Sequence, residues 1–139
     1  MATIIKPILS EKNKYWISKH RHYELKHFCL QYPMWVQIYS ELDDVSIPMS
    51  IIDRLPSTNL PSDPTEKRAL LKSYYMGKIK LIEDTAKAAD QYLAKYIVKA
   101  VTEGKSYTNL KSRLDIPCGK EMYYDRYRKF FWLLNKVRD

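Results

Sequence analysis

The stretch GKSYTNLKSRLDIPCGKEMYYDRYRKFFWLL, residues 104–134, decides how the rest of this sequence is interpreted. Ser106 is a good N-cap for a short helix that reaches Arg113. The residue before Pro117 is disfavoured in a helix, whereas proline suits the first turn of a new one. The stretch therefore predicts two helices, a short one over 106–113 and a longer one over about 118–136, with a tight break between them.

The longer helix has an apolar stripe. Its members recur every three or four residues, at Tyr123, Tyr127, Phe130, Leu134 and Val137. Such spacing places side chains on one face of a helix and predicts a buried seam. Basic and tyrosine side chains lie around this stripe.

A short helix, a tight turn and a longer basic helix have the proportions of a DNA-binding helix-turn-helix. In that motif the second helix enters the major groove, and flanking residues contact phosphates. The residues predicted to face the groove are Lys120, Tyr124, Arg126 and Arg128. Those expected to contact the DNA backbone are Ser106, Tyr107, Lys111, Arg113 and Lys129. The alternative is a basic helical hairpin whose charged face is only solvated.

The distribution of charge favours a polyanionic partner. The 139 residues carry a formal net charge of +8. Residues 1–32 hold six basic and two acidic side chains, and residues 105–139 hold nine and four. Residues 33–104 are nearly balanced, with nine and ten. Segregation of positive charge to particular segments is typical of proteins that bind nucleic acid.

The same residues resemble known families. EGKSYTNLKSRLDIP is similar to region 4 of sigma factors and related helix-turn-helix regulators. CGKEMYYDRYRKFFWLL resembles the last helix of RinA-like and ArpU-like late-gene transcriptional regulators of phages, and SEKNKYWISKHRHYELKHFCLQYPMW resembles the opening of such small phage proteins. The resemblance is firmest over residues 86–134. It implies double-stranded DNA as partner and contact with a host RNA polymerase.

The resemblance also implies a core for the motif. The matching positions are Leu110, Leu114, Ile116 and Met122. Asp115 stands where the turn usually has glycine, which is tolerable because aspartate accepts left-handed conformations better than most residues. The step from Ile116 to Met122 is one residue longer than usual, so the register of the DNA-facing side chains departs from the family's.

The remainder of the chain predicts an all-α protein, a helical bundle with a C-terminal helix-turn-helix over about 86–137. Residues 1–42 form an N-terminal helical segment, with a helix that begins after Ser10 and breaks at Pro33. Residues 43–64 hold four of the seven prolines and predict a linker or strap. From 65 the pattern is helical again, with a bend expected near 84–88 and a stop at Gly104.

Other kinds of site are not favoured. His20 and His27 lie on one helix face and His22 and Cys29 on another, so these four residues do not form a zinc site. The acidic clusters, including Glu121 with Asp125, have no catalytic arrangement, and a P-loop is missing. The sequence thus predicts neither enzyme, cofactor nor metal.

The sequence predicts a cytoplasmic protein. Its two cysteines are far apart and read as reduced thiols, and the opening residues have no apolar signal core. No apolar run is long enough for a membrane span. The first hypothesis is a sequence-specific DNA-binding transcriptional regulator of phage type. The alternatives are a small-terminase-like packaging subunit, which would form a homo-oligomeric ring, and a helical module that inhibits a host complex through tyrosine and tryptophan side chains.

Overall fold

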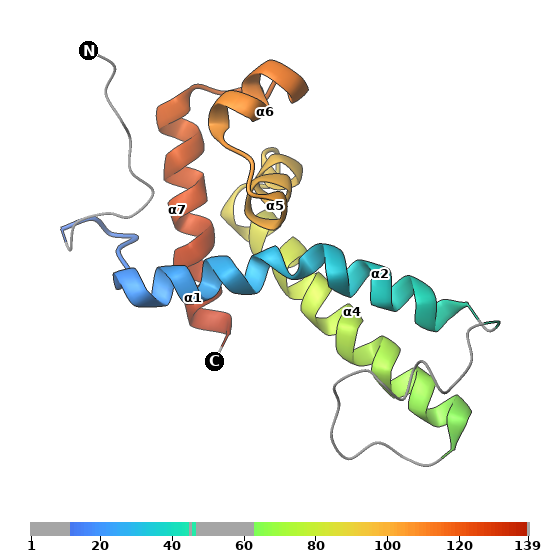
Figure 1. Cartoon of the computed structure of the whole chain (residues 1–139). Coiled ribbons are helices and arrows are strands. Elements are labelled where there is room, and N and C mark those ends of the chain that lie inside the picture. The colour runs from blue at the N-terminus through green and yellow to red at the C-terminus, as the bar shows by residue number, and fades with distance from the viewer. Residues whose placement is uncertain (1–11, 45, 47–62, 139) are drawn as a thin grey trace. The chain divides into compact units, whose positions relative to one another are not determined.

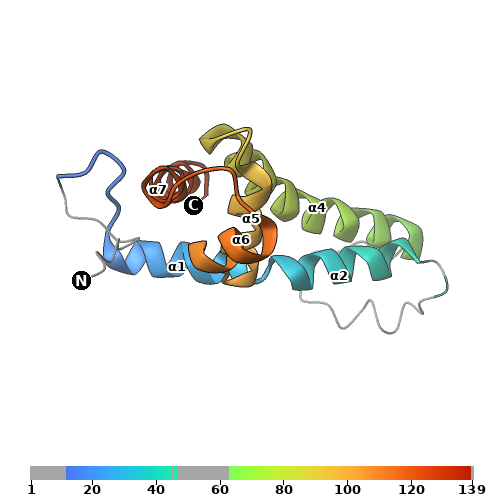
Figure 2. The ribbon, with the colours of Figure 1, turned by 90° about the horizontal axis from the view of Figure 1, so that it is seen from above.

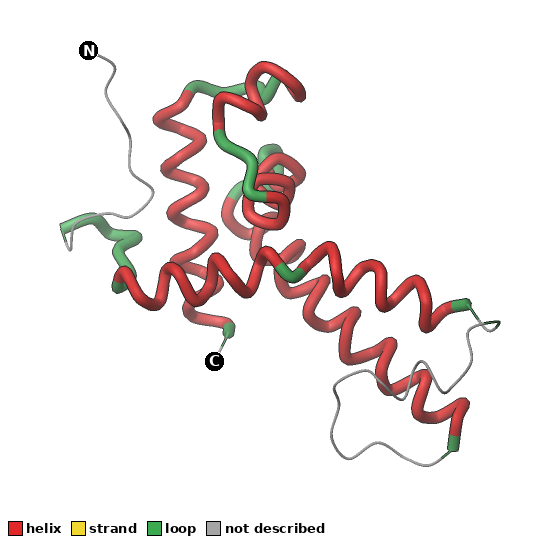
Figure 3. Tube along the Cα trace, in the orientation of Figure 1, coloured by secondary structure: helices red, strands yellow, loops and turns green. Residues whose placement is uncertain are grey.

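The computed structural model describes residues 12–44, 46 and 63–138 of the chain. Throughout these residues the backbone is helix, turn or loop, and no strand occurs among them (Figure 3). The prediction of an all-α protein is confirmed. The predicted strap over 43–64 lies for most of its length outside the described residues.

The chain divides into two compact units. Unit 1 combines the segments Met1–Gln31 and Ile82–Asp139, and unit 2 is Tyr32–Leu81. One helix, α4 (Pro64–Ala89), contributes its first part to unit 2 and its last turns to unit 1.

Unit 2 pairs α2 (Tyr32–Asp43) with the first part of α4, and the two helices lie side by side (Figures 1 and 2). Near the end of α2, the Arg68 guanidinium donates to the carbonyl oxygen of Leu42 at 2.7 Å. At the other end of the pair, the Lys78 ammonium lies 5.2 Å from the ring centre of the buried Trp35. This order of contacts makes the pair antiparallel.

Unit 1 contains α1 (Lys19–Leu30), α5 (Ala94–Glu103), α6 (Tyr107–Leu114) and α7 (Lys120–Val137). Helix α1 packs against α5 and α7, and α5 also packs against α6 and α7. Figure 2, in which α7 is seen nearly end on, shows α5 and α6 on the same side of α7. The largest fully buried side chains of this core are Leu25, Ile82, Ile97, Leu110, Ile116, Tyr123, Phe130, Phe131 and Leu134.

The helix ends around α6 follow the local sequence signals. Gly104 has a φ of 69° and ends α5, and Ser106 caps α6 through its side chain. Asp115 ends α6 in the left-handed conformation with a φ of 51°. Short polar side chains tolerate this region better than branched ones. The predicted short helix, break and longer helix are confirmed as elements.

The predicted start of the first helix is wrong. Residues 12–18 form turns and a loop, and α1 begins at Lys19 after the N-cap Ser18, not after Ser10. The Asn13 side chain accepts a hydrogen bond from the backbone N–H of Tyr15 at 2.9 Å. Asparagine competes with helix formation through such local bonds. The break near Pro33 is confirmed, because α1 ends at Leu30 and α2 begins at Tyr32.

The bend expected near 84–88 lies a few residues later. Helix α4 continues through Gly77 and ends at Ala89, and α5 begins at Ala94. Asp90 causes the interruption, since its Oδ1 accepts from the backbone N–H groups of Tyr92 and Leu93 at 2.9 and 3.0 Å. Such local bonds from an aspartate side chain stabilise a turn and compete with continuation of the helix.

The predicted core of the two-helix motif is correct in part. Leu110 and Ile116 are fully buried, but Leu114 and Met122 are 39% and 46% exposed. The stripe on α7 is buried at Tyr123, Phe130 and Leu134, whereas Val137 is 58% exposed. Leu114, Met122 and Val137 were wrongly predicted to be buried. All three lie near the ends of their helices, where a neighbouring helix no longer covers them.

Candidate nucleic-acid interface

The first turn of α6 holds two of the predicted phosphate contacts. The Ser106 hydroxyl accepts from the backbone N–H of Asn109 at 3.2 Å. The Tyr107 hydroxyl donates to the carbonyl oxygen of Cys118 at 2.7 Å, in the loop before α7. The Ser106 side chain therefore caps α6, and the Tyr107 side chain holds α6 to the loop before α7. Ser106 remains exposed at the surface.

The turn between α6 and α7 is flanked by cations. The Lys111 ammonium lies 3.3 Å from the carbonyl oxygen of Ile116 and 3.9 Å from the Asp115 carboxylate. Arg113 and Lys120 are exposed on either side of the turn. Within the described part of the chain neither of these two makes an ion pair, so their charges face solvent.

Three of the four predicted groove-facing residues share one flank of α7. Lys120, Tyr124 and Arg128 follow one another at intervals of four, which places them above one another on a helix. The Arg128 guanidinium donates from Nε to the carbonyl oxygen of Tyr124 at 3.0 Å. Within the described ranges Arg128 makes no other hydrogen bond or ion pair, so its remaining N–H groups are available for an external acceptor. Lys129 is half-buried.

Arg126 stands apart from this flank. Its Nε donates to Asp90 Oδ2 at 3.0 Å, and its Nη1 is paired with Asp125. The side chain of Asp90 is only 10% exposed and that of Arg126 is 33% exposed. This pair joins α7 to the segment between α4 and α5, so the structure does not bring Arg126 together with the other three residues.

Acidic side chains reduce the positive potential near the turn. Glu121 is exposed in the first turn of α7, and the Asp115 side chain is 96% exposed. Coulombic attraction and repulsion between exposed groups are both weakened by salt. Among the described residues, Arg113 and Lys120 are thus exposed cations beside the turn that make no ion pair, although Asp115 and Glu121 lie close to them in the sequence.

An aromatic cluster underlies the interface. Tyr107 and Tyr123 have ring centres 5.5 Å apart, and Tyr124 and Tyr127 have centres 6.0 Å apart. Burial raises the pKa values of Tyr123 and Tyr127 well above the usual range, with smaller contributions from neighbouring tyrosines and cysteines, of which Cys29 is the larger at Tyr127. Both phenols are therefore neutral and able to donate a hydrogen bond at any working pH.

Two residues that the sequence did not single out belong to this region. Asp90 holds Arg126 from a position 36 residues away, which no local spacing rule detects. Lys105, directly after the helix stop at Gly104, is half-exposed beside the tyrosine cluster. A cation at the first position after a glycine stop was the available signal for Lys105.

Arg21, another basic residue of the N-terminal segment, has a structural role. Its Nε donates to Asn135 Oδ1 at 2.7 Å, and its Nη2 donates to the carbonyl oxygen of Arg138 at 2.5 Å. These bonds join the start of α1 to the end of α7. The Arg21 guanidinium is thereby largely committed within unit 1.

Compared with known protein families, curated proteins and solved structures, the chain matches none of them. Among the described residues, no group of three His, Cys, Asp or Glu side chains is placed to hold a metal ion. Within the same residues, none of the helices has both the length and the apolar character required to cross a membrane.

Proposed function

We propose that this protein is a sequence-specific DNA-binding regulator of transcription, of the phage type that its sequence resembles, with α6 and α7 as its helix-turn-helix. One observation carries the proposal. Helix α6, capped by Ser106 and ended by Asp115, is joined to α7 by a turn beside which Arg113 and Lys120 are exposed. Exposed cations beside such a turn are well placed to contact phosphates.

In this proposal the two helices have different roles. The flank of α7 that carries Lys120, Tyr124 and Arg128 faces base edges in the major groove. Arginine and lysine pair with guanine there, and the Arg128 fork retains free N–H groups after its bond to Tyr124. Lys111 and Arg113 contact phosphates at the end of α6. Arg126, paired with Asp90, holds α7 in place.

The test is binding to a pool of random duplex DNA over a series of salt concentrations. Each phosphate contact removed lowers the slope of log affinity against log salt by about 0.9. The double variant Lys111→Ala/Arg113→Ala should therefore reduce the slope by about two and weaken binding to all sequences. Arg128→Ala should instead relax the preference for one motif, by about 1–3 kcal/mol at the base it reads.

The matched control removes two positive charges elsewhere in unit 1. Lys87 and Lys95 are both exposed, and Lys87→Ala/Lys95→Ala changes the net charge by the same amount. Equal loss of binding in the two double variants would indicate attraction to net charge and contradict an interface at the turn. Absence of binding by the folded protein at roughly 50 mM salt would overturn DNA binding altogether.

A second candidate function is a helical module that binds a protein partner. The observation in its favour is the exposure of large apolar side chains in unit 2. Met34, Leu70 and Tyr74 are 50%, 47% and 51% exposed. Such residues are frequent in protein interfaces. Binding that does not depend on salt, to protein and not to DNA, would favour this candidate; a ring-sized mass with DNA binding would favour a packaging subunit.

A further inference from the structure

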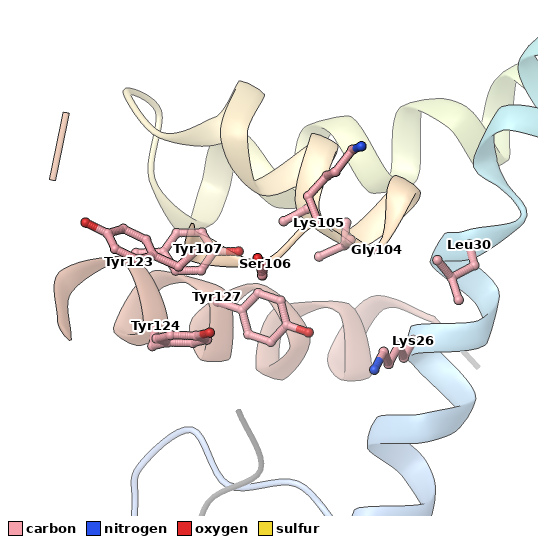
Figure 4. Close-up of a pocket in the computed structure, with 11 residues that line it drawn as sticks. Lys26, Leu30, Gly104, Lys105, Ser106, Tyr107, Tyr123, Tyr124 and Tyr127 are labelled. Carbon is pink, nitrogen blue, oxygen red and sulfur yellow. The ribbon is translucent and has the colours of Figure 1, made fainter. Parts of the chain in front are cut away.

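A pocket of about 220 Å³ lies in unit 1 between α1, α5, the start of α6 and the first half of α7. Four tyrosines line it, together with two lysines: Tyr107, Tyr123, Tyr124, Tyr127, Lys26 and Lys105. Figure 4 shows the tyrosines grouped at one end of the pocket and Lys26 of α1 at the other. Helices far apart in the sequence thus contribute to one concave surface.

The charged groups of the pocket are all positive. Among the described residues that line it there is no carboxylate; besides the tyrosines and lysines they contribute aliphatic side chains, a glycine and the Ser106 hydroxyl. Among the described residues neither Lys26 nor Lys105 makes an ion pair. An anion that enters the pocket would therefore lie near the ammonium group of Lys26, with no opposing charge among the described lining residues (Figure 4).

The flat apolar surface comes from Tyr124 and Tyr127, which are half-buried, because the Tyr107 hydroxyl is bonded to the Cys118 carbonyl oxygen and Tyr123 is 1% exposed. The rings of Tyr123, Tyr124 and Tyr127 form a triangle, with the Tyr127 centre 6.0 Å from each of the other two and those two 5.1 Å apart. Burial keeps the phenols of Tyr123 and Tyr127 neutral, so they add no negative charge. Faces of tyrosine rings favour stacking with another aromatic ring.

The size of the pocket limits its ligand. Pockets for drug-sized molecules span about 300–1,000 Å³, so about 220 Å³ suits one ring system with a small substituent. We infer that this pocket binds a small anion that carries one aromatic ring, with the ring against the half-buried Tyr124 and Tyr127 and the anionic group toward Lys26, while Lys105 at the rim adds to the positive charge. A free mononucleotide and a single unpaired nucleotide of a strand share this chemistry. The inference does not depend on binding of duplex DNA.

The experiment separates the contributions of ring and charge by calorimetric titration of the full chain. The probes are thymidine 5′-monophosphate, thymidine and inorganic phosphate. The monophosphate should bind saturably, and thymidine and phosphate should each bind at least about tenfold more weakly, because each lacks one half of the recognition. Phosphate that binds as tightly as the monophosphate would show charge attraction alone and overturn the inference.

Two variants locate the binding. Lys26→Ala/Lys105→Ala should weaken the monophosphate at least about tenfold, while Lys87→Ala/Lys95→Ala, which removes the same charge elsewhere in unit 1, should leave it unchanged. Equal effects of both pairs, or no saturable binding by the folded wild-type chain, would contradict the proposed site. Both lysines are at the surface, so their replacement is not expected to unfold the protein.

A further titration distinguishes the two sources of ligand. A short single-stranded oligothymidylate that binds much more tightly than the monophosphate, and loses affinity in Lys26→Ala/Lys105→Ala, would assign the site to a nucleotide within a strand. An oligothymidylate that binds no better would assign it to a free small molecule. Either result is compatible with failure of duplex binding, so this inference and the proposed function are tested separately.

Discussion

His22 is a buried, neutral histidine in α1. It is 5% exposed, and its ring centre lies 4.8 Å from that of Phe131 on α7. Burial, assisted by the positive charge of Lys26, lowers its pKa from the ordinary value of 6.5 to about 4. The folded state thus disfavours the proton that the unfolded chain accepts readily.

The consequence is a pH dependence of stability. His22 is neutral in both states above pH 6.5, and between pH 6.5 and about 4 the unfolded state binds the extra proton. The free energy of unfolding should therefore decrease as the pH falls through this window, by about 2–3 kcal/mol from this residue. Urea unfolding of wild type and His22→Phe at pH 7 and pH 4.5 measures this decrease. Between the two pH values the variant should lose less free energy of unfolding than wild type. His27→Gln, at an exposed position of the same helix, should behave as wild type.

Asp90 makes two kinds of contact: it accepts hydrogen bonds from the backbone N–H groups of Tyr92 and Leu93, and it forms an ion pair with Arg126. Substitutions can separate these contacts. Asp90→Asn keeps an oxygen for the N–H groups of Tyr92 and Leu93 but removes the charge that faces Arg126. Asp90→Ala removes both, and should cost about 1 kcal/mol more than Asp90→Asn. A double-mutant cycle of Asp90→Asn with Arg126→Ala should show a coupling of about 1 kcal/mol in chemical unfolding. Arg126→Ala that leaves stability unchanged and abolishes DNA binding would instead place Arg126 at the DNA.

Gly77 lowers the stability of helix α4. The glycine lies in the interior of the helix, and a Cβ atom built there has no neighbour within 4 Å among the described residues. Gly77→Ala should raise the free energy of unfolding by about 0.5–1 kcal/mol, since alanine favours the helix and restricts the unfolded chain. Thermal or urea unfolding tests this.

Gly104→Ala is the matched control for that prediction. Gly104 ends α5 with a φ of 69°, and a Cβ there would lie 4.0 Å from Leu30 Cδ2, an ordinary distance. The loss of stability expected for Gly104→Ala would therefore come from backbone conformation alone, because alanine disfavours the left-handed region. Stabilisation by both substitutions would contradict the conformational explanation.

The sequence predicted elements better than their contacts. Gly104, Ser106 and Asp115 set helix ends through local bonds and backbone preferences, which are visible within a few residues. The predicted start of α1 was wrong because Asn13 and Ser18 also accept local hydrogen bonds from backbone N–H groups. The sequence alone does not show which of several such residues caps the helix. For the candidate site, the pairing of Arg126 with Asp90 depends on tertiary packing, so its spacing on α7 alone suggested a different role.

Unit 1 consists of two segments that lie far apart in the sequence. The hydrogen bond between Arg21 and Asn135 joins residues 114 positions apart, whereas unit 2 is a single stretch of chain, Tyr32–Leu81. Closing a long loop costs entropy before its contacts are gained. On a ribosome, α1 would emerge first and α7 last. We therefore expect α1 to remain without its final partners until α7 has been synthesised, while the contacts of unit 2 form earlier.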